Sequence, residues 1–213
     1  MIEHEPPTAI VLAGGEAMHL DVIEDLPDDA FVIAADSGLD QARRLGIAVD
    51  LIIGDLDSVS ARALAESEGI PIEQYPVDKN QTDLELALDA AARLDAVRII
   101  VVGGHGGRLD HLLANAAALT NPVLHGRRVE WLAGRDHAYV VGSGVTVHGV
   151  PGQTVSLIPI GGPVTGVTTR GLRWELNDAR LDAASARGIS NLMTSPYASI
   201  STTGGCLFAI LPG

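Results

Sequence analysis

The segment LIIGDLDS at residues 51–58 joins a short apolar run to a turn that carries two carboxylates. An apolar run of this kind, rich in β-branched residues, is typical of a strand buried in a parallel sheet. Three further runs have the same form and are each followed by Gly or Asp, at residues 9–13, 31–35 and 98–102. Helical patterns stand between and after these runs, at residues 38–45, 60–68, 82–94 and 109–119. We therefore expect βαβ units that form an α/β domain with a parallel sheet.

Capping residues predict where two of these helices begin. A serine cap opens the pattern at residues 60–68. Thr82 is followed three residues later by Glu85, which is the signature of a capping box. The apolar face that follows, made of Leu84, Leu88 and Ala91, supports a helix over residues 82–94.

The texture of the sequence changes after about residue 122. Helical periodicity fades, and short strand-like runs recur between Gly, Pro and Ser, as in an antiparallel sandwich or barrel. These runs lie at residues 129–133, 137–141, 145–148, 154–158, 164–169, 172–175 and 206–211. We place a domain boundary near Asn121 and Pro122, which gives an α/β domain of residues 1–121 and a β domain of residues 122–213.

Charge and composition exclude several classes of protein. The chain has 213 residues with 14 Lys and Arg against 27 Asp and Glu, a net charge of −13, which is the wrong sign for binding nucleic acid. No apolar stretch reaches the ~18 residues that a membrane helix needs, and the N-terminus is acidic where a signal peptide would be basic. Cys206 is the only cysteine, so no intrachain disulfide can form. We expect a cytoplasmic protein that does not bind membranes.

Carboxylates follow the ends of two predicted strands. Asp36 and Asp55 stand where open α/β sheets bind ligands, and Asp55 and Asp57 can aim at one point from a tight turn. Hard oxygen ligands of this kind suit Mg²⁺, with Asp78, Asp83 and Asp110 as further candidates nearby. Purely structural roles are also open to these residues. Asp is common in turns because it bonds its own backbone, and an acid such as Asp83 stabilises the first turn of a helix.

The glycine-rich segment GGHGGRLDH at residues 103–111 follows a strand and precedes a helix. Its backbone N–H groups can approach an anion closely, and Arg108 can fork onto phosphate oxygens, so the segment is a candidate phosphate cradle. It is neither a Walker A loop nor a GxGxxG motif, and such turns also arise for steric reasons. For His105 and His111 we favour capping or hydrogen-bonding roles over metal binding. Lys79 is the only lysine, so we expect phosphate charge to be met by metal, arginine and backbone.

Six blocks in this order resemble the thiamine pyrophosphokinase (thiamine diphosphokinase) family. The blocks are residues 11–15, 35–38, 54–58, 82–83, 103–111 with Asn115, and 188–191. The resemblance implies an N-terminal α/β domain that binds ATP and Mg²⁺, a C-terminal β-sandwich, and a homodimer with active sites between subunits. It also implies transfer of the diphosphoryl group of ATP to the hydroxyl of thiamine, with release of AMP.

The resemblance also implies roles for single residues. Asp55, Asp57 and Asp83 are expected to ligate Mg²⁺, with Arg108 on phosphate. The implied catalytic set is Asp55, Asp57, Asp83, Arg108 and Asp110, and the implied nucleotide set is Asp36, Gln81, Thr82, Gly104, Gly106, Gly107, Arg108 and Asn115. The implied thiamine set is Trp174, Ser190 and Asn191.

Physical reasoning supports a thiamine site, because the fixed positive charge of thiamine is attracted to acidic groups and to an aromatic face. Trp174 stands between charged neighbours, which favours this role, although alternation along a strand could instead turn it into the core. For Trp131 we expect simple packing.

Two positions depart from the family pattern. Ser37 replaces a frequent Gly, and Asn80 replaces an acid, which puts any metal role of position 80 in doubt.

The proton acceptor and the function itself keep alternatives open. Either Asp110 or Asp55 could accept the hydroxyl proton of thiamine. The rivals are another Mg²⁺-dependent transferase that uses a nucleotide, and a nucleotide or thiamine sensor without catalytic activity.

Overall fold

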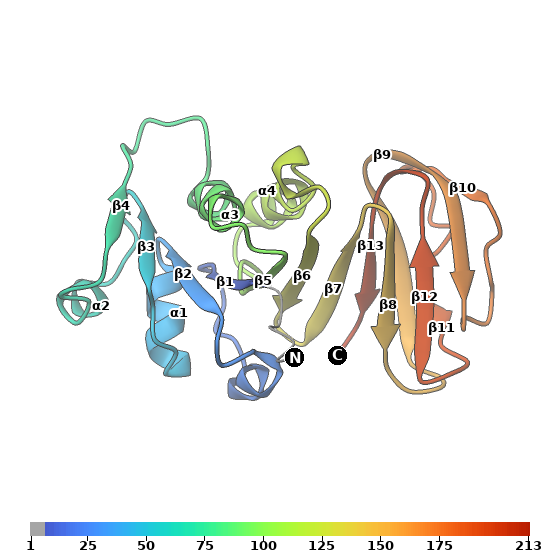
Figure 1. Cartoon of the computed structure of the whole chain (residues 1–213), viewed down its shortest axis with the longest axis horizontal. Coiled ribbons are helices and arrows are strands. Elements are labelled where there is room, and N and C mark those ends of the chain that lie inside the picture. Colours follow the sequence, from blue (N-terminus) through green and yellow to red (C-terminus); the bar gives the residue numbers. More distant parts are fainter. Residues whose placement is uncertain (1–6) are drawn as a thin grey trace, which may run out of the picture. The chain divides into compact units, whose positions relative to one another are not determined.

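The computed structural model describes residues 7–213, so the acidic residues 1–6 that argue against a signal peptide lie outside the described part (Figure 1). The described chain divides into two compact units. The α/β unit comprises residues 7–118 and 127–134, and the β unit comprises residues 119–126 and 135–213. The chain thus leaves the α/β unit close to the predicted boundary and then returns to it for one strand, which a single boundary does not describe.

The α/β unit is built on a parallel sheet with strand order β4-β3-β2-β1-β5-β6. Its strands are β1 (Thr8–Leu12), β2 (Phe31–Ala35), β3 (Leu51–Gly54), β4 (Ile72–Gln74), β5 (Arg98–Val102) and β6 (Arg128–Ala133). The four predicted strands and their parallel pairing are confirmed. The strand order reverses between β1 and β5, so the loops after these two strands flank the place where ligands bind in such sheets.

Four α-helices accompany this sheet, with α1 and α3 on opposite faces in Figure 1. They are α1 (Gly38–Leu45), α2 (Ala61–Ala65), α3 (Asp83–Arg93) and α4 (Leu109–Ala118), with a 3-10 turn η1 at Leu20–Asp25. The predicted capping box is confirmed: Thr82 Oγ1 accepts from the Glu85 N–H at 3.2 Å, and the Glu85 carboxylate accepts from the Thr82 N–H at 2.8 Å. Ser60 caps α2, which ends at Ala65, earlier than predicted.

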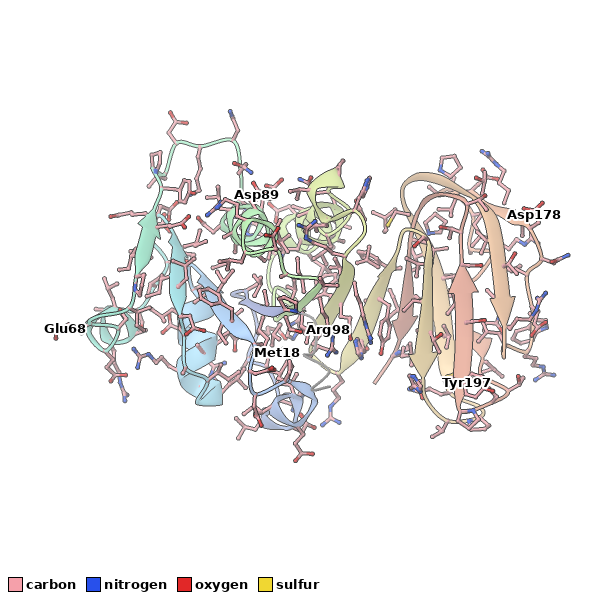
Figure 2. All side chains as sticks on the ribbon, in the orientation of Figure 1. Met18, Glu68, Asp89, Arg98, Asp178 and Tyr197 are labelled. Carbon is pink, nitrogen blue, oxygen red and sulfur yellow. The ribbon has the colours of Figure 1, made fainter. Side chains whose placement is uncertain are left out.

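Strand β6 is fixed in the parallel sheet by side-chain contacts with residues about 30 positions earlier in the chain. Arg98 on β5, which Figure 2 labels, has its Nε 2.7 Å from the buried Glu130 carboxylate. The Nε of Arg128 lies 2.8 Å from the same carboxylate. The indole N–H of Trp131 donates to the Gly103 carbonyl at 2.7 Å. Trp131 is buried, so its predicted packing role is confirmed.

The β unit is antiparallel and contains a short 3-10 turn η2 (Pro122–Leu124). Its strands are β7 (Asp136–Val141), β8 (Gly144–His148), β9 (Thr154–Arg170), β10 (Ala179–Leu181), β11 (Asn191–Leu192), β12 (Tyr197–Ser201) and β13 (Gly204–Leu211). The first half of β9 pairs with β13 and β11, and its second half pairs with β12 and β10. Alternate residues from all these strands except β11 form one apolar core that includes Val147, Leu157 and Leu207.

Two strand predictions for this unit were wrong. The runs at residues 154–158 and 164–169 belong to the single strand β9, which continues through Gly161 and Gly162. The run at 172–175 forms no strand, and only Leu172 makes an isolated bridge, to Met193. Among residues 7–213, no helix has both the length and the apolar character to cross a bilayer.

Candidate active site

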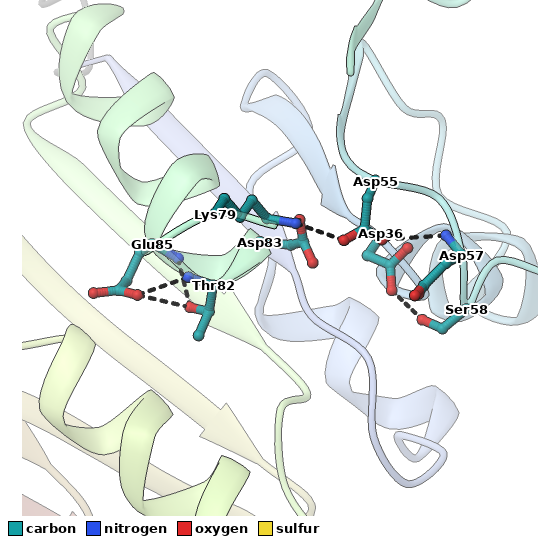
Figure 3. A network of polar contacts seen from close by, with 8 residues as sticks. All are labelled: Asp36, Asp55, Asp57, Ser58, Lys79, Thr82, Asp83 and Glu85. Carbon is teal, nitrogen blue, oxygen red and sulfur yellow. Dashed lines mark hydrogen bonds and ion pairs between the residues drawn. The ribbon is translucent and has the colours of Figure 1, made fainter. Parts of the chain in front are cut away.

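Three aspartates converge at the carboxyl ends of β2 and β3, as the spacing of the sequence predicted. Asp36 directly follows β2, while Asp55 and Asp57 follow β3. One carboxylate oxygen from each residue lies within 4.8 Å of the corresponding oxygens of the other two (Figure 3). We call Asp36, Asp55 and Asp57 the aspartate trio. Neighbouring parallel strands end at one edge of a sheet, which is why residues so far apart in sequence meet here.

The backbone around the trio is held in uncommon conformations. Asp36 has φ of 47° and Leu56 has φ of 66°, both in the left-handed region that non-glycine residues seldom adopt. The Ser58 hydroxyl donates to Asp36 Oδ2, and the Asp57 N–H donates to Asp55 Oδ1 at 3.2 Å. A Cβ at Gly54 would lie 3.1 Å from Asp83 Oδ1, so glycine keeps this space open for the carboxylates. Strain of this kind is common where a site must be held in shape.

Asp83 approaches from the first turn of α3 and is joined to the trio by Lys79. The Lys79 ammonium Nζ lies 2.6 Å from Asp55 Oδ2 and 3.1 Å from Asp83 Oδ1 (Figure 3). The predicted metal ligands were Asp55, Asp57 and Asp83. In the structure, Asp36 takes the place of Asp83 beside Asp55 and Asp57. Sequence reasoning missed the place of Lys79, because it lies before α3 and so outside the helix in which a spacing of four residues brings side chains together.

The pKa shifts follow from this crowding. The hydrogen bond from Lys79 lowers the pKa of Asp55, whereas the charge of Asp55 raises the pKa of Asp57. Burial raises the pKa of Asp83. Burial alone would lower the pKa of Lys79, but hydrogen bonds to Asp55 and Asp83 outweigh it, so that pKa is raised. The carboxylates thus repel one another, and a cation placed among them reduces that repulsion.

The trio has the chemistry of a site for a hard divalent cation. Asp36 is nine-tenths buried, with 9% of its surface exposed, and its Oδ1 has no hydrogen-bond partner. A buried carboxylate oxygen without a partner is costly unless a cation meets it. Converging carboxylate oxygens are the ligands that Mg²⁺ and Ca²⁺ prefer.

The glycine loop, residues 103–107, is shaped by its glycines and fastened from three sides. Its four glycines all have positive φ, between 62° and 88°. Trp131 holds the Gly103 carbonyl, the Asn115 amide donates to the Gly104 carbonyl at 2.8 Å, and the Glu16 N–H donates to the His105 carbonyl at 2.9 Å. Asn115, a predicted nucleotide contact, is therefore engaged in holding the loop.

Arg108 and Asp110 form an exposed pair with each other. Arg108 Nε lies 3.1 Å from Asp110 Oδ1, and its NH2 nitrogen lies 2.6 Å from Oδ2. This fork lowers the pKa of Asp110 to about 2. Asp110 is not a member of the trio as the structure stands.

The remaining predicted nucleotide contacts also have partners in the protein. The Gln81 amide donates to Asp89 Oδ2 at 2.8 Å, and Thr82 is engaged in the capping box. The Nδ1 atom of His105 is buried without a hydrogen-bond partner, which the predicted role of this residue did not anticipate.

Trp174, Ser190 and Asn191 meet on the β unit. The exposed fraction of Trp174 is 56%, so it does not lie in the core, and the Arg173 guanidinium stands 5.0 Å from its ring centroid. Asn191 is buried, and its amide both accepts from the Trp174 N–H at 3.1 Å and donates to the Trp174 carbonyl at 2.8 Å. Ser190 has φ of 57° and donates its N–H to Ser156 Oγ at 3.1 Å. Asn191 thus holds the backbone that presents the indole ring.

Comparisons with known proteins match the segments that carry these two sites to two domain models of one family. The family model "Thiamin pyrophosphokinase, catalytic domain" matches residues 24–130, and "Thiamin pyrophosphokinase, vitamin B1 binding domain" matches residues 145–207. The chain is 26% identical to thiamine pyrophosphokinase of Bacillus subtilis over 208 residues, which cover 95% of this chain and 97% of the relative. It is 24% identical to thiamine pyrophosphokinase 2 of rice over 202 residues, 86% of this chain and 72% of the relative.

Solved structures agree with this match. The crystal structure of the Bacillus subtilis protein has a TM-score of 0.84 at 25% identity and covers 96% of this chain and 98% of its own. The thiamin pyrophosphokinase of Candida albicans, at 15% identity, shares the fold with a TM-score of 0.79 and covers 97% of this chain and 90% of its own.

Proposed function

The chain belongs to the thiamine pyrophosphokinase family, and from this we infer that it transfers the diphosphoryl group of ATP to the hydroxyl of thiamine and releases AMP. One observation carries this conclusion. The catalytic-domain match spans the aspartate trio and the glycine loop, while the vitamin B1 binding match spans Trp174, Ser190 and Asn191. ATP and thiamine are therefore the two substrates, and each has a candidate site.

We assign Mg²⁺ to the carboxylates at the ends of β2 and β3. Asp55 and Asp57 are proposed ligands, with Asp36 beside them and Asp83 adjacent through Lys79. The buried Asp36 oxygen without a partner supports this assignment. When bound, Mg²⁺ supplies positive charge that offsets the charge of the phosphates during transfer.

Phosphate binding is assigned to the glycine loop and Arg108. We assign the phosphates to the backbone N–H groups of Gly106 and Gly107, while Asn115 fixes the loop. The predicted contact at Gly104 is corrected, because its N–H donates to the Gly14 carbonyl at 2.6 Å. Arg108 is exposed, so it can exchange Asp110 for phosphate oxygens, with Gln81 and Thr82 at the edge of the nucleotide.

The proton of the thiamine hydroxyl goes to Asp55 or Asp110. In the structure, the hydrogen bond from Lys79 lowers the pKa of Asp55, and the one from Arg108 lowers the pKa of Asp110 to about 2. Asp110 loses this partner when Arg108 turns to phosphate. The main task of the protein is to position the hydroxyl, whose proton leaves as the new oxygen–phosphorus bond forms.

Product analysis tests this function. The protein is incubated with ATP, Mg²⁺ and thiamine, and the products are separated by chromatography. We expect thiamine diphosphate and AMP in equal amounts, because the two outer phosphates move together. ADP with thiamine monophosphate would indicate transfer of one phosphoryl group, and binding of both substrates without any product would indicate a sensor.

We also propose a homodimer with active sites at the subunit interface. Helix α4 exposes Leu109 and Leu113, one turn apart, with exposed fractions of 68% and 62%. Neighbouring exposed leucines on one helix face favour contact with a second copy of the chain. Sedimentation equilibrium should give a mass of twice 22.1 kDa, and a single 22.1 kDa species at all concentrations would contradict the dimer. The cytoplasmic location stays a prediction.

A further inference from the structure

Lys79 is the only lysine of the chain, and it stands among the carboxylates assigned to the metal. Its side chain is 12% exposed, and those of Asp55 and Asp83 are 10% and 22% exposed. Lys79 lies just before α3, and its ammonium bridges the end of β3 and the first turn of that helix (Figure 3). A largely buried lysine that contacts two carboxylates is held in place by both charge and hydrogen bonds.

Both carboxylate oxygens of Asp55 already have partners within the protein. Oδ2 accepts from the Lys79 ammonium at 2.6 Å, and Oδ1 accepts from the Asp57 N–H at 3.2 Å. Each oxygen keeps a further lone pair, so a cation can still bind Asp55, but it then stands close to the Lys79 ammonium and is repelled by that charge. Asp83 meets Lys79 through Oδ1, so a cation that binds Asp83 is opposed by the same positive charge.

An ammonium on a flexible four-carbon stem can exchange one oxygen partner for another. A phosphate oxygen offers the same charge and the same hydrogen-bond acceptor as the Asp55 carboxylate. When a nucleotide binds together with its metal ion, a phosphate oxygen can accept the hydrogen bond from Lys79. The Asp55 carboxylate is then released to bind the ion.

We propose that Lys79 is a positioning residue that couples the binding of Mg²⁺ to the binding of ATP. It holds Asp55 and Asp83 in place, opposes Mg²⁺ that arrives alone, and turns to phosphate when Mg²⁺ arrives with the nucleotide. This inference rests on the proposed function, because it takes Asp55 as a metal ligand. By linkage, ATP and Mg²⁺ should then strengthen the binding of each other.

Calorimetry on the full chain tests the coupling. Mg²⁺ is titrated into wild type and Lys79→Met, first alone and then with α,β-methylene ATP, which cannot release its diphosphoryl group. Removing the competing charge should tighten binding of Mg²⁺ alone by about tenfold. The analogue should strengthen Mg²⁺ binding less in Lys79→Met than in wild type.

Two further variants serve as a charge control and as a substitute for an unfolded variant. Arg62→Met removes one positive charge from the exposed pair with Glu66 and should bind Mg²⁺ as wild type does. Lys79→Gln serves in place of Lys79→Met if circular dichroism shows that the latter is unfolded. Equal or weaker binding of Mg²⁺ alone by the Lys79 variant overturns the inference only. Absence of Mg²⁺ binding by every protein contradicts the metal assignment itself, and with it this inference.

Discussion

Asp57→Asn will lower the rate constant for thiamine diphosphate formation by about a thousandfold, because it removes charge from the proposed metal site that stabilises the transferred phosphates. The folded protein should be no less stable in EDTA. The charge of Asp55 raises the pKa of Asp57, so the aspartate is repelled in the folded state, and a neutral amide relieves that repulsion. Steady-state product formation and urea unfolding measure the two effects separately.

Asp182→Asn is the matched control for this variant. Asp182 is an exposed aspartate of the β unit that pairs with Arg180, and it lies outside the proposed site. The control should keep the wild-type rate constant. If Asp57→Asn also kept that rate constant, the assignment of the trio to the metal would be refuted.

Trp174→Ala will raise the KM for thiamine by about thirtyfold, which corresponds to loss of about 2 kcal/mol of cation–π contact with the thiazolium. The KM for ATP should not change, because Trp174 is proposed to contact thiamine only. An exposed indole can be removed without opening a cavity in the core, so the fold should be retained. Initial rates over a range of each substrate give both constants.

Trp174→Phe separates the ring from the rest of the side chain. It keeps an aromatic face, and we expect it to recover most of the affinity for thiamine. Equal KM values for thiamine in wild type, Trp174→Phe and Trp174→Ala would place thiamine elsewhere.

Local sequence signals were sufficient for most of the α/β unit. The apolar runs of β1, β2, β3 and β5 are buried and long enough to be recognised, and the capping box marks the start of α3. Strand β4 was missed because it has three residues, of which Ile72 is exposed, so it lacks the apolar pattern of a buried strand. Strand β6 was recognised but not its partner, because the ion pair of Glu130 with Arg98 depends on tertiary pairing.

The β unit was harder to predict because its pairing is less local. Strand β9 continues through two glycines that look like a turn in sequence, and it changes partners along its length. Residues 172–175 have the alternation of a strand, but the segment is fixed instead by Asn191, which bonds the Trp174 backbone. A side chain that holds a distant loop leaves no periodic signal in sequence.

The candidate site could be predicted where residue type alone fixes the chemistry. Carboxylates after parallel strands had to meet at one edge of the sheet, and they do. Partners within the site could not be predicted. The contact of Lys79 with Asp55 and the pairing of Arg108 with Asp110 depend on where side chains turn after folding.

The position of the bound metal ion shows whether the aspartates at the ends of β2 and β3 form the metal site. Crystals grown with Mn²⁺ in place of Mg²⁺, together with α,β-methylene ATP, allow the ion to be found by its anomalous scattering. We predict a peak within bonding distance of carboxylate oxygens of Asp55 and Asp57, about 2 Å as for Mg²⁺, with Asp36 or Asp83 completing the protein ligands. A nucleotide-bound ion that touches none of these four aspartates would contradict the proposed metal site.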